Sequence, residues 1–435
     1  MPYDIIIGRD EADKERFGDK GLIFLGKSYV KMGMQNSMSN KIYMDIARSH
    51  VVLVSGKRGS GKSYTLGVIA EEISTLPQES AKNIASLIFD TMGIFWTMKY
   101  KNEKDEQLLT KWGLQKREIP INIFVPEGKA EEYEKKQIPF DNTFALAPSE
   151  LEAEDWITLF NLQLTSLTGV LIQRAITKLK EEGKYTIKKI QDKIEKDSKA
   201  SKETKEIVSS LFDAAESWGI FSKGEQGTEI SELINAGKTT ILDVSVYSSI
   251  GAFNIRALVI SLISRKLFKS RMDSRKQEEI KAIQKGRQYS TSPEDRDSPL
   301  VWIFIDEIHE FLPKIETTPA TDALIQLLRE GRQPGISLVL ATQQPGQIHK
   351  DVVTQSDIVL SHRVTAKPDI EALNEIMQTY LLTNIQKQID DLPSLKGSAI
   401  ILDDNSERIY PMRVRPRFTW HGGEAPTAIQ AEVKI

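Results

Sequence analysis

A chain of 435 residues is long enough for one large α/β core with insertions, or for two to three domains. With 40% hydrophobic and 27% charged residues it has the composition of a folded globular protein, which excludes collagen, coiled-coil and wholly disordered structures. It has no cysteine, which excludes disulfide scaffolds and thiolate chemistry, and its net charge of −3 excludes a uniformly basic surface that coats nucleic acid.

The sequence contains no signal for the membrane. No apolar run reaches about 18 residues, and the first residues lack a basic region followed by an apolar stretch. We therefore expect a soluble, cytoplasmic protein with no membrane insertion.

The predicted elements begin with a glycine-rich region. Residues 1–49 hold five glycines between short apolar pieces, which predicts a short N-terminal β-rich cap. From His50 onward, apolar runs alternate with amphipathic segments, as in a mostly parallel sheet with helices on both faces. The predicted strands are 51–56, 85–90, 121–126, 239–244, 301–306, 336–342, 357–362 and 398–403.

A long interruption separates the third and fourth of these strands. Residues 145–235 contain no convincing strand and have apolar residues at roughly helical spacing, so we expect a helical insertion. The fold class is thus α/β, with a core divided into two parts by that insertion. The expected domains are the N-terminal region 1–49, the first core part 50–144, the insertion 145–235, the second core part 236–415 and a tail 416–435.

The first functional motif follows the strand 51–56 and precedes a helical segment. It matches the pattern G-x-x-x-x-G-K-[ST] and consists of Gly56, Lys57, Arg58, Gly59, Ser60, Gly61, Lys62 and Ser63. Its glycines let successive N–H groups surround one anion at a helix N-terminus. The motif predicts a nucleoside triphosphate site where Lys62 contacts the phosphates, the Ser63 hydroxyl binds Mg²⁺ and the next residue, Tyr64, lies against the nucleotide. The alternative, a loop that binds the nucleotide without hydrolysing it, is compatible with the same motif.

A second apolar strand, LVWIFI, delivers two carboxylates to its carboxyl end. Ligands collect at this end of open α/β sheets, so Asp306 is expected to hold Mg²⁺ through a water and Glu307 to orient the attacking water. The alternative is an acid pair that caps a helix. His309, which follows closely, has no metal-ligand spacing to other histidines and is expected to make packing or polar contacts.

An amide pair follows the strand 336–342. Gln343, or else Gln344, could donate to the γ-phosphate and accept from the water, and so sense which nucleotide is bound. The alternative is a capping turn around Pro345.

Three arginines are candidates for stabilising the transferred phosphoryl group. Arg332 and Arg329 lie at the end of the segment LLREGRQPG, and Arg363 follows the strand 357–362. In ring ATPases such a guanidinium commonly comes from the neighbouring subunit, and Arg332 is the favoured candidate. A salt bridge at a helix end is the competing interpretation.

These pieces, in order, resemble the HerA-like ATPases of the HerA/FtsK superfamily, best known from archaea. The residues that carry the resemblance span about 50–423 and include HVVLVSGKRGSGKSYTLGVIAEE, FDTMGIFW, VWIFIDEIHEFLP, LLREGRQPGISLVLATQQP, SDIVLSHRV and MRVRPRFTWHGG. The resemblance implies a RecA-like P-loop NTPase core with ATP and Mg²⁺ as cofactors. It also implies a homo-oligomeric, hexameric ring that translocates on double-stranded DNA.

The resemblance also implies residue roles and a partner. It assigns the phosphate-loop lysine to Lys62, the carboxylate pair to Asp306 and Glu307, the glutamine to the Gln343 and Gln344 pair, and the finger to Arg332. The closing segment with Arg415 and Arg417 resembles a tail that passes near a nucleotide site. A NurA-type nuclease is the implied partner, although 49 residues are too few for the complete N-terminal β-barrel of better-studied members.

Three functions are compatible with these features. The leading hypothesis is an ATP-driven DNA translocase of helicase type. The alternative is an ATPase that energises a type IV secretion or pilus-like machine with protein substrates. The third is a nucleotide-dependent switch with little turnover.

Overall fold

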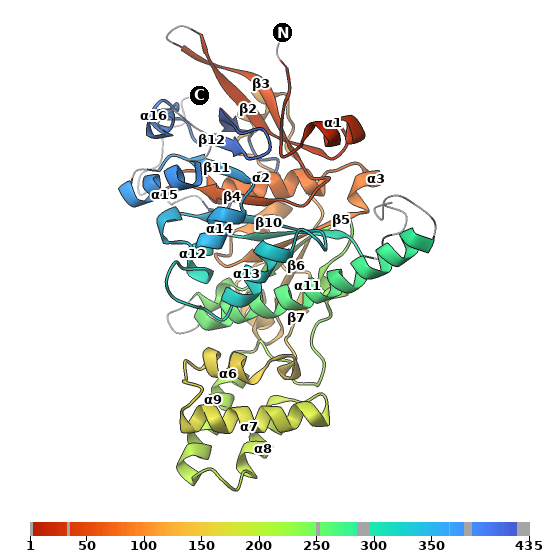
Figure 1. Ribbon diagram of the computed structural model, residues 1–435, viewed down its shortest axis with the longest axis vertical. Helices are drawn as coiled ribbons and strands as arrows, with labels where there is room; N and C mark the ends of the chain where they lie inside the picture. Colours follow the sequence, from red (N-terminus) through yellow and green to blue (C-terminus); the bar gives the residue numbers. More distant parts are fainter. Residues whose placement is uncertain are drawn as a thin grey trace.

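The computed structural model describes residues 3–32, 35–248, 253–284, 296, 298–364, 366–377 and 385–423. Within these residues the strands form one 13-stranded sheet that crosses the molecule, with helices on both sides (Figure 1). The strands are β1 (Ile5–Ile7), β2 (Leu22–Met32), β3 (Gln35–Asp45), β4 (Val51–Ser55), β5 (Ile84–Asp90), β6 (Ile121–Pro126), β7 (Asn142–Phe144), β8 (Thr239–Asp243), β9 (Leu300–Ile305), β10 (Ile336–Thr342), β11 (Ile358–His362), β12 (Ser398–Asp403) and β13 (Arg408–Val414).

The helices follow the strands along the chain. They are α1 (Glu11–Phe17), α2 (Lys62–Ser74), α3 (Gln78–Ala81), α4 (Glu106–Trp112), α5 (Ala130–Lys135), α6 (Ala153–Leu159), α7 (Leu167–Glu182), α8 (Ile187–Glu195), α9 (Lys202–Ser217), α10 (Ile230–Leu233), α11 (Phe253–Gln284), α12 (Ile308–Phe311), α13 (Thr321–Glu330), α14 (Lys350–Gln355), α15 (Lys367–Met377) and α16 (Ile385–Asp390). None of these helices combines the length and the apolarity that crossing a membrane requires.

The strand order is β1-β3-β2-β13-β12-β11-β4-β10-β9-β5-β8-β6-β7. Every pair from β11 to β7 is parallel, whereas β12, β13 and β2 run antiparallel to their neighbours. The predicted α/β fold with a mostly parallel RecA-like sheet is confirmed. Because parallel strands end at one edge, the residues after β4, β10, β9 and β5 meet there.

All eight predicted strands are present, with ends that agree within one residue. Strand β13 was not predicted, because its sequence RIYPMRV places arginines and a proline in a partly buried strand. Proline lacks a donor for the ladder and so argues against a strand inside a sheet. Because β13 pairs with β2, the N-terminal strands extend the core sheet instead of standing apart from it.

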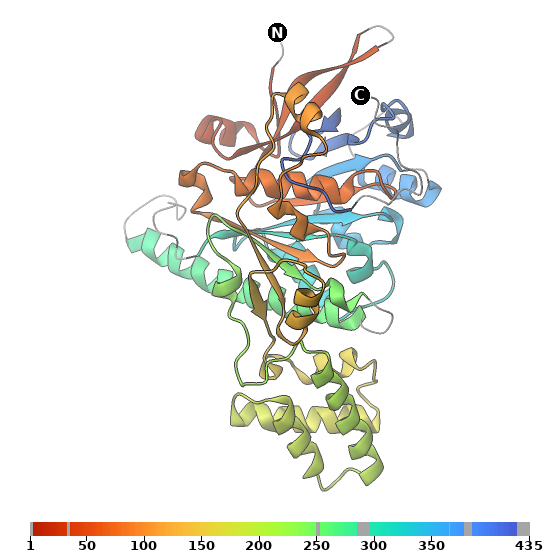
Figure 2. The same cartoon turned by 180° about the vertical axis from the view of Figure 1, so that it is seen from behind.

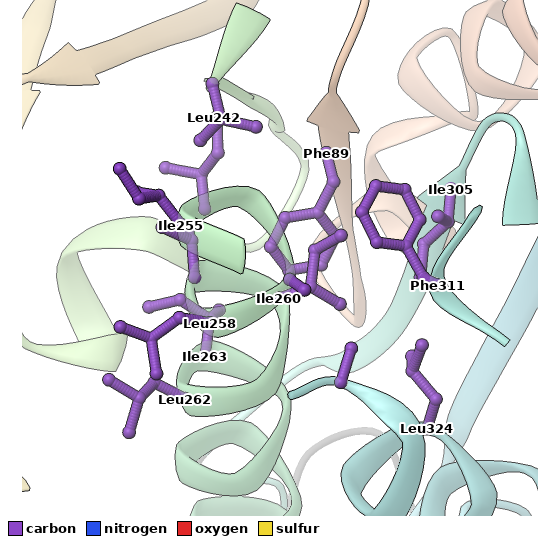
Figure 3. Close-up of a cluster of buried hydrophobic side chains, with 14 of the residues drawn as sticks. Phe89, Leu242, Ile255, Leu258, Ile260, Leu262, Ile263, Ile305, Phe311 and Leu324 are labelled. Atoms are coloured by element: carbon purple, nitrogen blue, oxygen red, sulfur yellow. The ribbon is translucent and has the colours of Figure 1, made fainter. Parts of the chain in front are cut away.

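Two apolar cores lie on opposite faces of the sheet. On one face, alternate residues such as Leu87 and Phe89 of β5 pack against α11 and α13. Figure 3 shows part of this core, where side chains of α11 meet Phe89, Ile305 of β9 and Phe311 of α12. On the other face, Ile88 packs with apolar residues of α2. Burial on both faces explains why these strands are continuous apolar runs.

The segment between β7 and β8 carries α6 to α10. Helices α7, α8 and α9 project from the core in both views (Figures 1 and 2). Aromatic side chains join them to α6 and to the core of the sheet: Trp156 of α6 lies 4.9 Å from both Phe212 of α9 and Phe221, measured between ring centroids. The chain therefore leaves the sheet after β7 and returns in β8, next to β5 and β6. The domain boundaries given above remain predictions.

Candidate active site

The glycine-rich loop joins β4 to α2 at the carboxyl edge of the sheet. Gly56, Gly59 and Gly61 have φ angles of 155°, 74° and 117°, which side chains disfavour. A Cβ on Gly56 would lie 2.4 Å from the Ser60 hydroxyl oxygen, so the loop closes this tightly only with glycine there. The Gly56 N–H donates to the Thr342 carbonyl at 3.3 Å, which ties the loop to the end of β10.

Helix α2 begins directly at Lys62, with Gly61 at its N-cap and no side chain covering its first N–H groups. The Lys62 side chain turns back over the loop, where its ammonium donates to the Lys57 carbonyl at 3.4 Å. Burial lowers the pKa of Lys62, and the charges of Glu307 and Asp306 oppose that effect. Free N–H groups and a lysine over one loop form an anion-binding site.

Asp306 meets the loop from across the sheet. The Ser63 hydroxyl donates to Asp306 Oδ2 at 2.5 Å, and Asp306 Oδ1 accepts the N–H of Glu307 at 2.9 Å. A hydroxyl and a carboxylate are oxygen ligands of the kind that Mg²⁺ prefers. No group of three or more histidine, aspartate or glutamate side chains in the described part of the chain could hold a metal. A metal here would therefore need further ligands from a nucleotide or from water.

Glu307 is held in a strained conformation beside Asp306. Its φ of 52° and ψ of 46° lie in the left-handed region, which is uncommon for a residue other than glycine and typical of functional sites. Its Oε1 accepts a hydrogen bond from Gln343 Nε2, whereas Oε2 is buried without a hydrogen bond from any described residue. Burial, followed by the charge of Asp306, raises the pKa of Glu307.

The two glutamines occupy different positions. Gln343 lies at the carboxylate of Glu307, whereas Gln344 is exposed and its backbone N–H donates to Thr342 Oγ1 at 3.0 Å. The same hydroxyl lies 3.2 Å from His309 Nδ1, so His309 makes a polar contact beside the site. Of the predicted pair, the geometry places Gln343 where it contacts the catalytic candidate.

The three candidate arginines lie apart from one another. Arg329 on α13 forms an ion pair with Asp351 of α14 at 2.7 Å. Arg332 follows that helix and is exposed. Arg363 lies next to the glycine-rich loop, where its carbonyl accepts the N–H of Lys57 at 3.1 Å and its side chain donates to Ser394 at 3.3 Å.

The structure corrects the expectation for Arg415. Its guanidinium is fully buried, donates to Glu71 at 3.0 Å and contacts Glu72 at 2.8 Å. These glutamates lie more than two turns along α2 from the glycine-rich loop. A guanidinium enclosed in this way cannot reach a nucleotide, so Arg415 anchors the chain after β13 to α2.

Residues after Arg415 complete this anchor. Glu71 also accepts from Arg417 Nε at 3.1 Å and from the backbone N–H groups of Phe418 and Thr419, both at 3.0 Å. The Tyr64 hydroxyl accepts the N–H of Arg417 at 2.6 Å. Tyr64 thus joins the closing segment to the first turn of α2, a contact that no local motif indicates.

Sequence reasoning also missed His362, which lies under the loop. Its Nε2 is 2.8 Å from Thr65 Oγ1 of α2, and its Nδ1 is 3.1 Å from the Ser398 carbonyl. Burial lowers the pKa of His362 to about 4, so the ring is neutral at pH 7. The motif SHRV contains this histidine, but only the pairing of β11 with β4 brings it to the loop.

A glycine-rich loop before a helix and a carboxylate pair on a second parallel strand define a P-loop NTPase. In the RecA-like class of these proteins a further strand lies between the two, as β10 does here between β4 and β9. The chain belongs to the HerA family within this class, because residues 30–267 match the family model described as "Helicase HerA, central domain".

Two curated relatives are similar to parts of this chain, and one solved structure shares its fold. A probable DNA double-strand break repair helicase HerA of Methanocaldococcus jannaschii is 33% identical over 69 residues, which cover 16% of this chain. The DNA double-strand break repair helicase HerA of Pyrococcus furiosus is 26% identical over 148 residues, 32% of this chain. These matches cover only 14% and 24% of the two relatives. VirB4 of Thermoanaerobacter pseudethanolicus, 12% identical with a TM-score of 0.53, shares the fold over 92% of this chain and 97% of its own.

Proposed function

We propose that this protein is an ATP-driven motor that forms a homo-oligomeric ring, a hexamer, and moves double-stranded DNA. The observation that carries the proposal is the meeting of Lys62, Ser63, Asp306 and Glu307 at one edge of the sheet. The HerA family supplies the substrate class, since both curated relatives are described as DNA double-strand break repair helicases.

The residues of the loop fit ATP with Mg²⁺. Lys62 would hold the β- and γ-phosphates, the loop N–H groups would surround them, and Ser63 with Asp306 would hold the metal. The buried Ser60 hydroxyl has no hydrogen-bond partner in the described residues, so it is available to a phosphate oxygen. The metal would neutralise charge on the phosphates.

Glu307 is suited to align the attacking water. Gln343 fixes one carboxylate oxygen and leaves the other without a hydrogen bond, so that this oxygen can accept one from water. A raised pKa makes the carboxylate a better base. We therefore propose Glu307 as the water-orienting residue and Gln343 as its link to the γ-phosphate.

Arg332 is the proposed finger, with Arg329 and Arg363 as alternatives. Exposure suits Arg332 for a site on a neighbouring copy, whereas Arg329 is engaged with Asp351 and Arg363 lies beside its own loop. An arginine supplied across an interface contributes about a thousandfold or more in related nucleotide hydrolases.

Mixing two inactive variants tests the finger. Arg332→Ala and Lys62→Ala subunits are each expected to hydrolyse ATP at under about a hundredth of the wild-type rate. In an equimolar mixed ring, about one interface in four pairs an intact Lys62 with an intact Arg332, so about a quarter of the activity returns. Arg48→Ala, which removes an exposed ion pair with Asp13, is the matched control. A mixture as inactive as its components rejects Arg332.

DNA dependence tests the motor itself. Duplex DNA is expected to raise the ATPase rate about tenfold at low salt, with the stimulation lost between about 50 and 200 mM salt, since phosphate contacts release counterions. Size determination on the same sample checks the ring. A flat rate in a ring-shaped preparation would contradict the proposal. It would favour the secretion-type ATPase if turnover is substantial, and the switch if turnover is slow.

A nuclease of the NurA type belongs to the proposal as a partner. This partner follows from the resemblance to the HerA-like ATPases; the two relatives are described as break-repair helicases.

A further inference from the structure

Arg256 is a buried cation in the first turns of α11. The residue is only 7% exposed and stands between Ile255 and Ala257, which are fully buried in the apolar core. Burying a guanidinium is costly unless ion pairs and hydrogen bonds compensate. Its described partners therefore indicate which elements the charge holds together.

Two of those partners lie at the carboxyl edge of the sheet. Arg256 Nη2 lies 3.2 Å from Glu310 Oε2 of α12, and Nη1 donates to the Thr91 carbonyl, directly after β5, at 3.4 Å. The guanidinium carbon is also 5.9 Å from the ring centroid of Phe311. Figure 3 shows Phe311 packed beside Ile305, the last residue of β9. Arg256 thus connects α11 to the single turn of helix that follows the catalytic carboxylates.

Helix α12 is directly coupled to Glu307. It begins at the next residue, and the Glu310 N–H donates to the Glu307 carbonyl at 2.9 Å. The left-handed conformation of Glu307 is energetically unfavourable and persists only where the surroundings hold it. A side-chain anchor on α12 resists rotation of this turn, and with it the movement of the Glu307 carboxylate away from Gln343.

We propose that Arg256 is a positioning residue for ATP hydrolysis, which acts through Glu310 to hold Glu307 in its water-aligning conformation. The inference rests on the proposed role of Glu307. Arg256 touches neither the loop nor Ser63 in any contact described above, so its loss is expected to slow turnover without weakening nucleotide binding. Misplacing a catalytic group by about 1 Å costs on the order of a hundredfold in rate.

A second buried arginine, Arg9, provides a control that distinguishes a positioning role from a general effect on stability. Arg9 is 2% exposed, donates to Asp45 Oδ1 at 2.8 Å through Nε and to the Lys20 carbonyl at 2.7 Å. It has the same kinds of partner as Arg256, but Asp45 ends β3, which lies near the far edge of the sheet from β9. Arg9→Met should therefore destabilise the fold without touching the site.

The test compares Arg256→Met, Arg256→Lys and Arg9→Met with wild type, by thermal unfolding, nucleotide affinity and ATPase kinetics. In Arg256→Met, kcat is expected to fall about ten- to hundredfold, with KM and nucleotide affinity within about twofold of wild type. Arg256→Lys keeps the ion pair with Glu310 and should recover part of kcat. Arg9→Met should lower Tm with kcat unchanged.

Equal kcat in Arg256→Met and Arg9→Met would overturn the inference. Should Arg256→Met fail to fold, Glu310→Ala removes the same anchor from a side chain that is 34% exposed, and an unchanged kcat there would also overturn it. A wild-type protein without ATPase activity would instead reject the proposed function, which keeps the two failures distinguishable.

Discussion

Glu307→Gln is expected to lower kcat for ATP hydrolysis by at least about a hundredfold while nucleotide affinity stays within about twofold of wild type. Glutamine has nearly the shape of glutamate and its carbonyl oxygen can still accept from Gln343 Nε2, so the local packing should survive. The amide cannot take a proton from water, and it offers an NH₂ group where the wild type has a carboxylate oxygen.

Binding of a fluorescent ATP analogue and phosphate release, measured on the same preparation, check this result. Lys62→Ala is the complementary variant, because it removes the ammonium expected to contact the phosphates and should weaken nucleotide binding as well as turnover. Normal turnover in Glu307→Gln would mean that another group aligns the water. Lost binding in the same variant would mean that Glu307 supports the nucleotide itself.

Glu71→Gln is expected to destabilise the protein by about 3–5 kcal/mol, the cost of removing one partner from a buried ion pair. Glu71 is fully buried and accepts hydrogen bonds from Arg415, Arg417 and two backbone N–H groups. With a neutral amide in its place, two buried guanidinium groups lose their shared counter-charge. Denaturant unfolding followed by fluorescence measures the change.

Its neighbour provides the control. Glu72 contacts Arg415 Nε at 2.8 Å, but its side chain is 14% exposed, and among the described residues Arg415 is its one arginine ion-pair partner, so Glu72→Gln should cost less than Glu71→Gln. Burial raises the pKa of Glu71, but the charges of Arg415 and Arg417 lower it by a larger amount, so that the pKa lies below the ordinary value. Its stabilisation is therefore present above the unfolded-state pKa and is lost as the pH falls through the folded-state value. Equal losses in both variants would contradict the central position of Glu71.

Features that depend on short, local sequence motifs could be predicted from the sequence. The glycine-rich loop needs positive φ angles at defined positions, and the motif supplies glycines there. The core strands were recognisable because both faces of the sheet are covered, which demands continuous apolar runs. The carboxyl ends of those runs then placed Asp306 and Glu307 at the loop, although the insertion separates them from Lys62 in the chain.

Features that depend on pairing between distant segments could not be predicted. The sequence favours Gln343 but leaves Gln344 open, because which amide faces Glu307 depends on how the chain turns at the end of β10. The tail arginine Arg415 was assigned to the nucleotide on resemblance, yet the antiparallel pairing of β13 buries it against α2.

The amino-acid order alone was enough to establish a phosphate-binding α/β core, because a loop motif and an apolar strand are local and each has few structural solutions. Packing settled which charged residues face the site and which are buried as anchors, among them Arg256 and Glu71. A buried charge is stable only beside partners that the fold brings from elsewhere in the chain, and so its role cannot be inferred from its sequence neighbours.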